Sequence, residues 1–201
     1  DLVARQLTGV RDFETGFHLD RMARYSRLIA QTIASSHGLN DEFVESVYLF
    51  ASLHDIGKIA VPDHILLKSG PFTPSEWDIM KTHVTMGATI LAGGRSPYLK
   101  MGAEIALNHH ERWDGGGYPN GLAGNAIALP ARIMNICDIY DALRSKRPYK
   151  VAFDHARSME TITRGDGRTD PSHFDPQILQ TFVKNESLFR EIFEINAKLT
   201  T

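Results

Sequence analysis

Along most of this chain, apolar residues recur at steps of three and four, and this spacing constrains the fold more than any other feature. The first such stripe holds His18, Met22, Tyr25, Ile29 and Ile33, and Gly38 follows it. A second stripe, with Asn40 or Asp41 as its cap, holds Val44, Val47, Ala51, His54 and Asp55, and Gly57 follows it. Residues spaced in this way lie on one side of an α-helix, so the pattern predicts two helices with buried faces, each ended by a glycine. The His-Asp pair is expected at the C-terminal end of the second helix.

The other breaks in the chain predict further helices. Thr73 to Glu76 forms a capping box with proline at the first helical position, and the helix that it opens should carry Met80, His83, Val84 and Gly87 on one side. A helix after Pro97 is expected to end in His109 and His110, and a helix after Pro130 brings Asp138 and Asp141 onto one face. The Asp175-Pro176 pair begins a closing helix. The predicted fold class is therefore all-α.

Composition excludes several classes of protein. A length of 201 residues with 42% hydrophobic residues suits one buried core, and no apolar run approaches the ~18 residues that cross a bilayer. We expect a cytoplasmic chain without membrane insertion. The single cysteine, Cys137, forms neither an internal disulfide nor a thiolate cluster, so any metal site must use nitrogen and oxygen ligands. A net charge of -2 provides no overall field for DNA, so an anionic substrate would need a local site.

Imidazoles and carboxylates gather at the inner ends of the predicted stripes. The eight potential metal ligands are Glu14, His18, His54, Asp55, His83, His109, His110 and Asp138. Such a set suits iron, manganese, nickel or zinc. A single histidine on an apolar face is more often a hydrogen-bonded core residue, and Glu14 alone could be an exposed carboxylate at a helix start. Eight such residues together favour a metal centre.

Several strings in the sequence resemble the signature of the HD-GYP family. They are ETGFH at 14–18, HDIGK at 54–58, HHERWDGGGYP at 109–119, DIYDAL at 138–143, RPYK at 147–150 and FDP at 174–176. The resemblance implies an HD-type helical bundle with a metal centre in the bundle core. It also implies that residues 1–201 form one HD-GYP phosphodiesterase domain, and the absence of an initiating methionine suggests that this domain is excised from a longer regulatory protein.

The resemblance also implies roles for single residues. His54, Asp55, His83, His109, His110 and Asp138 correspond to the family's shared metal ligands, and Asp55 is expected to bridge two metals. Glu14 and His18 correspond to the additional ligands of its three-metal members. Lys58 would hold the scissile phosphate, which makes Lys58 and Asp55 the expected catalytic pair. Tyr118, Asp141, Arg147 and Lys150, together with Lys58, match positions at the substrate.

The activity implied by the resemblance is hydrolysis of cyclic di-GMP to pGpG, to GMP or to both, by metal-activated hydroxide. Two or three divalent transition metals are implied, with iron or manganese favoured and nickel or zinc as alternatives. A GGDEF-type domain is a candidate partner, and a mixed cyclic dinucleotide is an alternative substrate. Two other functions stay open: an inactive module that senses cyclic di-GMP or binds a GGDEF domain, and an HD phosphohydrolase that acts on another nucleotide.

Overall fold

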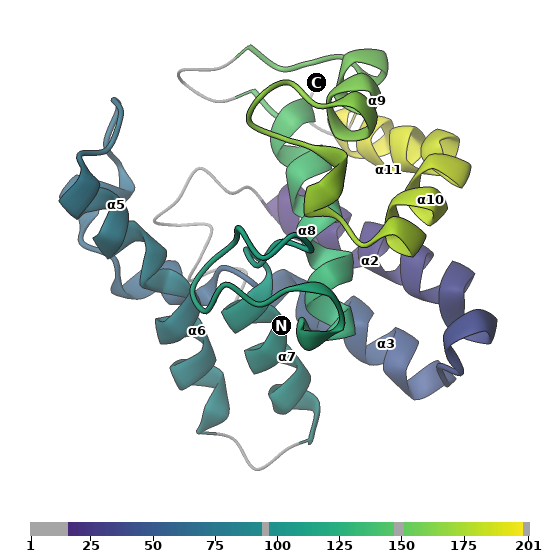
Figure 1. Ribbon diagram of the computed structural model, residues 1–201, viewed down its shortest axis with the longest axis horizontal. Helices are drawn as coiled ribbons and strands as arrows, with labels where there is room; N and C mark the ends of the chain where they lie inside the picture. Colours follow the sequence, from purple (N-terminus) through teal and green to yellow (C-terminus); the bar gives the residue numbers. More distant parts are fainter. Residues whose placement is uncertain (1–15, 94–96, 147–150, 199–201) are drawn as a thin grey trace.

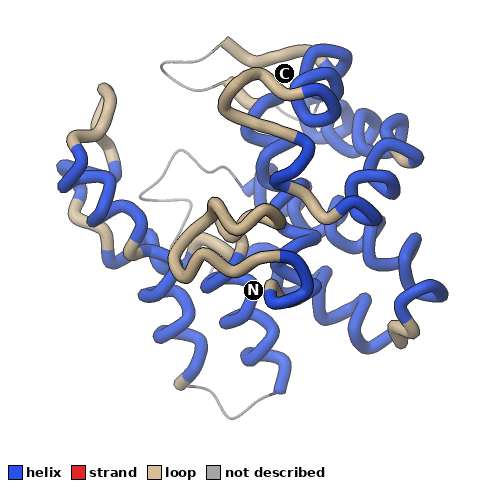
Figure 2. The backbone as a smooth tube through the Cα atoms, viewed as in Figure 1, coloured by secondary structure: helices blue, strands red, loops and turns tan. Residues whose placement is uncertain are grey.

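The structure of the protein is a computed structural model that describes residues 16–93, 97–146 and 151–198 (Figure 1). Its α-helices are α2 (Gly16–His37), α3 (Asp41–Phe50), α4 (Asp63–Leu66), α5 (Pro74–Lys81), α6 (His83–Ala92), α7 (Pro97–Asn108), α8 (Leu129–Arg144), α9 (His155–Arg164), α10 (Pro176–Lys184) and α11 (Glu186–Lys198). Short 3-10 helices are η1 (Ala51–Leu53), η2 (Ile56–Ala60), η3 (Gly124–Ala126) and η4 (Pro171–His173). No strand occurs within the described ranges, only an isolated bridge between Asp114 and Ala123 (Figure 2). The prediction of an all-α fold is confirmed.

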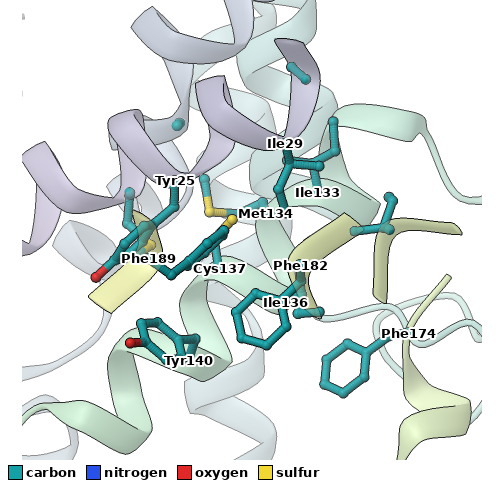
Figure 3. Packing of buried hydrophobic residues seen from close by; sticks show 14 of the residues in the cluster. Tyr25, Ile29, Ile133, Met134, Ile136, Cys137, Tyr140, Phe174, Phe182 and Phe189 are labelled. Carbon is teal, nitrogen blue, oxygen red and sulfur yellow. The ribbon is translucent and has the colours of Figure 1, made fainter. Parts of the chain in front are cut away.

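The main core lies between α2 and α8, which pack against each other, and the C-terminal helices cover it (Figure 3). Tyr25 of α2 stacks on Phe189 of α11, with 4.6 Å between ring centroids. Tyr140 of α8 meets Phe182 of α10 edge to face at 5.4 Å. Aromatic side chains bury the largest apolar areas, so these pairs hold α10 and α11 on the central helices. The helix from Pro176, predicted as the closing one, is followed by α11, and neither α9 nor α11 was predicted.

The helix ends at both sides of the first turn form as the sequence predicts. Gly38 follows α2 with a φ of +61°, a conformation that favours glycine. Asn40 caps α3, because its side-chain oxygen accepts a hydrogen bond from the Phe43 amide at 2.9 Å. Thr73 and Glu76 also form the expected capping box at the start of α5. At these positions, the local sequence was therefore sufficient to predict where a helix begins or ends.

The second predicted helix is wrong at its C-terminal end. The α-helix stops at Phe50, and His54 and Asp55 lie in a turn between η1 and η2. Gly57 does not end a helix; it lies inside η2, against the backbone of α6. A Cβ atom at this position would lie 1.9 Å from the His83 carbonyl oxygen and 2.4 Å from the Gly87 nitrogen. The glycine thus permits a close approach that any larger residue would block.

The helix predicted from Thr73 through Gly87 is divided in two. α5 ends at Lys81, and α6 starts at His83. Thr82 lies between them, and its amide donates to the Ile79 carbonyl three residues earlier, at 3.0 Å. Its hydroxyl bonds to the same carbonyl at 2.7 Å, which competes with the regular helical pattern. Because of this break, α5 lies at the edge of the molecule while α6 packs on α7 (Figure 1).

Candidate metal centre

Seven of the eight predicted ligands lie within the described residues, and the structure brings them into two groups. The first group is Asp55, His83, His109 and His110; the second is His18, His54 and Asp138. Within each group, one ligand atom from every residue lies within 4.8 Å of the others. Glu14 lies outside the described residues, so its predicted role is not tested. His18, predicted beside Glu14, shares its group with His54 and Asp138.

Five separate parts of the fold supply these side chains. α2 carries His18, α8 carries Asp138, and His83 is the first residue of α6. The turn between η1 and η2 presents His54 and Asp55, while His109 and His110 directly follow α7. Contacts of α6 with η2 and α7, and of α2 with η1 and α8, bring these parts together. The centre therefore depends on the packing of the whole bundle.

Hydrogen bonds at Nδ1 orient three of the imidazoles. His54 Nδ1 lies 2.9 Å from the Ala51 carbonyl oxygen, and His83 Nδ1 lies 2.8 Å from the Met80 carbonyl oxygen. His109 Nδ1 makes the same kind of bond to Ala106, at 3.0 Å. A carbonyl oxygen only accepts, so Nδ1 must donate the proton, and the neutral ring then presents a lone pair at Nε2. Metal-binding histidines in proteins are oriented in this way.

Asp55 connects the two groups. Its Oδ1 lies 3.1 Å from His83 Nε2 and 3.6 Å from His109 Nε2, and its Oδ2 lies 3.0 Å from His54 Nε2. This position fits the bridge that the sequence predicts. Lys58, whose side chain is partly exposed, places its Nζ 3.0 Å from Oδ2.

The contact between His83 and Asp55 fits a shared cation. Both Nε2 of His83 and Oδ1 of Asp55 are buried, and neither has a hydrogen-bond partner among the residues that the structure describes. With the proton at Nδ1, each of these atoms is an acceptor, and two acceptors 3.1 Å apart repel each other unless a cation lies between them. Nitrogen and oxygen ligands, each about 2.0–2.2 Å from one ion, are separated by a comparable distance. The donor set therefore fits a divalent metal.

Burial favours the neutral form of two histidines of the first group, His109 and His110. It lowers the pKa of His109, against the effect of Asp55, and holds the pKa of His110 well below the usual range. Burial alone would raise the pKa of Asp55, but the charge of Lys58 holds it well below its usual range. Neutral imidazoles beside an ionised carboxylate are the protonation states that metal binding needs.

Asp141 was predicted at the substrate, but both of its oxygens contact α2. Oδ2 accepts from His18 Nδ1 at 2.8 Å, and Oδ1 accepts from Arg21 Nε at 2.5 Å. Only 1% of Asp141 is exposed. Burial raises the pKa of Asp141, but the bonds from Arg21 and His18 outweigh this effect and lower the pKa to about 2. Asp141 thus contacts His18, a predicted metal ligand, and its place at the substrate stays a prediction.

The loop at 109–119 is fastened to the centre by residues whose roles the sequence did not reveal. Glu111 is buried, and its two oxygens accept from the amides of Asn120 and Leu122 at 2.7 and 2.9 Å. Asn135 of α8 donates to the carbonyl oxygens of His109 and Glu111. Glu111 was visible only as a letter of the family string. Arg21 and Asn135 left no signal, because their partners are distant in sequence.

Tyr118 lies directly against the metal centre. Its ring stacks on His110, with 4.8 Å between centroids. Gly117 makes this possible, because a Cβ atom there would lie 2.4 Å from the Arg112 nitrogen. The tyrosine predicted at the substrate is thus beside a predicted ligand. Arg147 and Lys150, the other predicted substrate contacts, lie outside the described residues.

The helical bundle, in which imidazoles and carboxylates converge, is typical of the class of helical domains that bind divalent metals. The family model described as an HD domain matches residues 14–178, so the chain belongs to the HD domain family. Within the ranges that the structure describes, no helix has both the length and the apolar character to span a bilayer.

Two curated relatives are named cyclic di-GMP phosphodiesterase. One, from Vibrio cholerae, is 43% identical over 188 residues, which cover 89% of this chain and 37% of the relative. The other, from Thermotoga maritima, is 40% identical over 191 residues, which cover 95% of this chain and 50% of the relative. The chain thus spans half or less of their lengths. These relatives confirm the HD-GYP resemblance.

A solved structure of a cyclic GMP-AMP specific phosphodiesterase from V. cholerae has the same fold. Its TM-score with this chain is 0.63 at 16% sequence identity, and the alignment covers 98% of this chain and 51% of that one.

Proposed function

We propose that this domain is a metal-dependent phosphodiesterase that hydrolyses cyclic di-GMP to pGpG, to GMP or to both. The observation that carries the proposal is the position of Asp55, which contacts histidines of two adjoining ligand groups. Paired sites of this kind serve in-line displacement at phosphorus in many hydrolases. The two relatives named cyclic di-GMP phosphodiesterase support the choice of substrate.

The two ligand groups would each hold one divalent cation, with Asp55 between them. Bound there, the cations would supply a nucleophile at neutral pH and compensate the charge that develops on the phosphoryl oxygens. An imidazole and carboxylate set without thiolate suits iron or manganese, and also nickel or zinc. A third cation beside Glu14 and His18 stays a prediction.

The chain's own residues have separate tasks in this proposal. Lys58, close to Asp55, would hold the scissile phosphate through a charge-assisted hydrogen bond. Asp141 and Arg21 would keep the His18 ring in its orientation. Burial raises the pKa of Tyr118, and the charges of Asp55 and Asp138 raise it further, so its hydroxyl keeps its proton and can donate to a substrate oxygen.

Local charge would select a small anionic substrate. Two divalent cations among the carboxylates Asp55 and Asp138 leave a positive excess, and Lys58 adds to it. The chain as a whole carries a net charge of -2, which does not favour extended nucleic acid. Arg147 and Lys150, outside the described residues, remain predicted contacts to the phosphates or bases. A GGDEF-type partner and a longer regulatory protein around this domain also remain predictions.

The test is product analysis by chromatography after incubation of anaerobically purified protein with cyclic di-GMP and with a mixed cyclic dinucleotide. We expect pGpG or GMP from cyclic di-GMP, and no product from His54→Ala or Asp55→Ala. His64→Ala, which changes an exposed histidine, is the matched control and should behave as wild type. Lys58→Ala should keep its metal and lose turnover by about 100-fold or more, as for other lost contacts to developing charge.

Each alternative gives a different result. Binding of cyclic di-GMP without any product would favour the sensing module. Hydrolysis of nucleotide monoesters alone would favour another HD phosphohydrolase. Full activity of His54→Ala or Asp55→Ala, at an unchanged metal content, would contradict the metal-centre mechanism.

A further inference from the structure

A row of aromatic rings leads outward from the metal centre to α5. Tyr118 stacks on His110, at 4.8 Å between centroids and an interplanar angle of 28°. Trp77 of α5 meets Tyr118 nearly at right angles, at 5.9 Å. Phe72 lies nearly parallel to Trp77, at 6.1 Å and 23°. The row therefore connects a predicted metal ligand with an indole at the edge of the molecule.

Trp77 is unusually open for a residue of its size. Its exposed fraction is 42%, whereas tryptophan is highly buried on average. The nearby small core of Val61, Ile65, Leu66 and Met80 accounts for Phe72, which packs against it. Packing against that core does not account for the exposed indole of Trp77. Next to a centre that would be positively charged with its metals bound, an open aromatic surface is where a ligand with both a flat ring and a phosphate would fit.

We propose that Trp77 forms a base-stacking subsite for one purine of a cyclic dinucleotide whose phosphate lies at the metal centre. This inference rests on the proposed function. In a nucleotide, a ribose separates the base from the phosphate, and Trp77 is likewise set apart from His110 by one ring, that of Tyr118, which lies 5.9 Å from the indole and 4.8 Å from the imidazole. Phe72 supports the indole from one side, so the subsite is built before the ligand arrives.

The subsite would act on affinity and not on the choice of base. Every purine presents a π-face, so stacking tolerates guanine and adenine alike. A stacked base is worth about 1–3 kcal/mol in other proteins, which corresponds to about fivefold to more than a hundredfold in affinity. Trp77 would therefore hold cyclic di-GMP and a mixed guanine-adenine dinucleotide similarly well.

The first experiment compares GMP with ribose 5-phosphate as competitive inhibitors of cyclic di-GMP hydrolysis, because the two differ only by the base. In Trp77→Ala, we expect the inhibition constant of GMP to rise at least about fivefold and that of ribose 5-phosphate to stay the same. Trp77→Phe, which keeps a smaller ring, should retain most of the GMP affinity. Ile79→Ala is the matched control, since Ile79 lies on the same helix with a similar exposed fraction, 41%.

The second experiment measures binding without turnover. The chain has two tryptophans, Trp77 and Trp113, so Trp113→Phe leaves Trp77 as the only fluorophore of its kind. Titration of this metal-loaded variant with GMP should quench its fluorescence, whereas ribose 5-phosphate should not. This measurement stands even if the wild type hydrolyses no cyclic dinucleotide, a result that would reject the proposed function alone.

The proposal is overturned if Trp77→Ala, folded and with wild-type metal content, binds GMP as tightly as Ile79→Ala does. Equal weakening of GMP and ribose 5-phosphate would also overturn it, because Trp77 would then support the phosphate site and not the base. A loss of GMP affinity in Trp77→Phe as large as in Trp77→Ala would contradict stacking as the cause.

Discussion

Two aspartates one turn apart on α8 have different partners. Asp138 belongs to a ligand group with His18 and His54, whereas Asp141 accepts hydrogen bonds from His18 and Arg21. From sequence the two carboxylates look equivalent, because both lie on the same helix face. What distinguishes them is a cation 120 residues away, Arg21, whose pKa is raised by Asp141 against the effect of burial. The candidate ligands other than His83 could be predicted because they lie in the family strings.

The first prediction concerns Asp141→Asn. The asparagine side chain is neutral and has a single oxygen, so it cannot accept from His18 and Arg21 as the two carboxylate oxygens do. The buried guanidinium of Arg21 then loses its counter-ion. Breaking a buried pair in this way costs about 3–5 kcal/mol of unfolding free energy, and a lost ligand-orienting bond weakens metal affinity by about 10- to 100-fold. Urea denaturation and metal titration measure the two effects.

A matched control separates the effect of losing a buried carboxylate from that of losing any negative charge. Glu160→Gln removes the carboxylate of an exposed ion pair with Arg164, and we expect it to cost less than about 1 kcal/mol. Wild-type metal affinity in folded Asp141→Asn would show that this aspartate does not position His18.

At the scale of elements, the sequence predicted where helices begin better than where they end. Caps such as Asn40 and Thr73 are local, and the structure confirms them. The end of α3 depends instead on what packs beside it, and the end of α5 on a side-chain hydrogen bond of Thr82. Gly57 looked like a helix stop, but it serves the close contact of η2 with α6, and no pattern within one segment reveals a contact with another.

The second prediction concerns Gly57→Ala. The added methyl group would overlap the His83 carbonyl and the Gly87 amide, so η2 must move away from α6. This movement separates His54 and Asp55 from His83. We expect a loss of about 3 kcal/mol or more of unfolding free energy, at the upper end of overpacking effects, together with weaker metal binding.

Gly70→Ala is the control for that substitution, because a Cβ atom at Gly70 meets no described part of the chain within 4 Å. Chemical denaturation of both variants makes the comparison. Equal stability of Gly57→Ala and Gly70→Ala would refute the close-contact explanation.

At the scale of the whole molecule, the bundle buries histidines that a metal would need in neutral form. The fold class was predictable, since helical spacing covers most of the chain. The exact grouping of ligands was not, because it depends on how five segments meet. His18 lies with His54 and Asp138, an arrangement that only the packing of α2 on α8 and η1 creates.

The third prediction concerns pH. Burial lowers the folded-state pKa of His109 and His110 below that of the unfolded chain, near 6.5. Above about 6.5, both states are neutral at these positions and stability is fully present. As pH falls below that value, the unfolded chain binds protons first, so stability is lost. Urea denaturation of chelator-treated protein should give a lower unfolding free energy at pH 5.5 than at pH 7.5.

Two variants test which histidines cause the pH dependence of stability. His110→Gln should reduce the pH dependence of the metal-free protein, whereas the exposed His64→Gln should leave it as in wild type. An equal pH dependence in wild type and His110→Gln would exclude His110 as a source of the effect.

The central claim is that hydrolysis depends on metal held by these imidazoles and carboxylates. The most direct measurement is the rate of cyclic di-GMP hydrolysis against the number of manganese ions bound per chain, after removal of all metal with a chelator. We expect no hydrolysis in the metal-free protein and recovery in proportion to bound metal, complete at two or three ions per chain. Full hydrolysis by protein that contains less than about a tenth of an ion per chain would contradict the account.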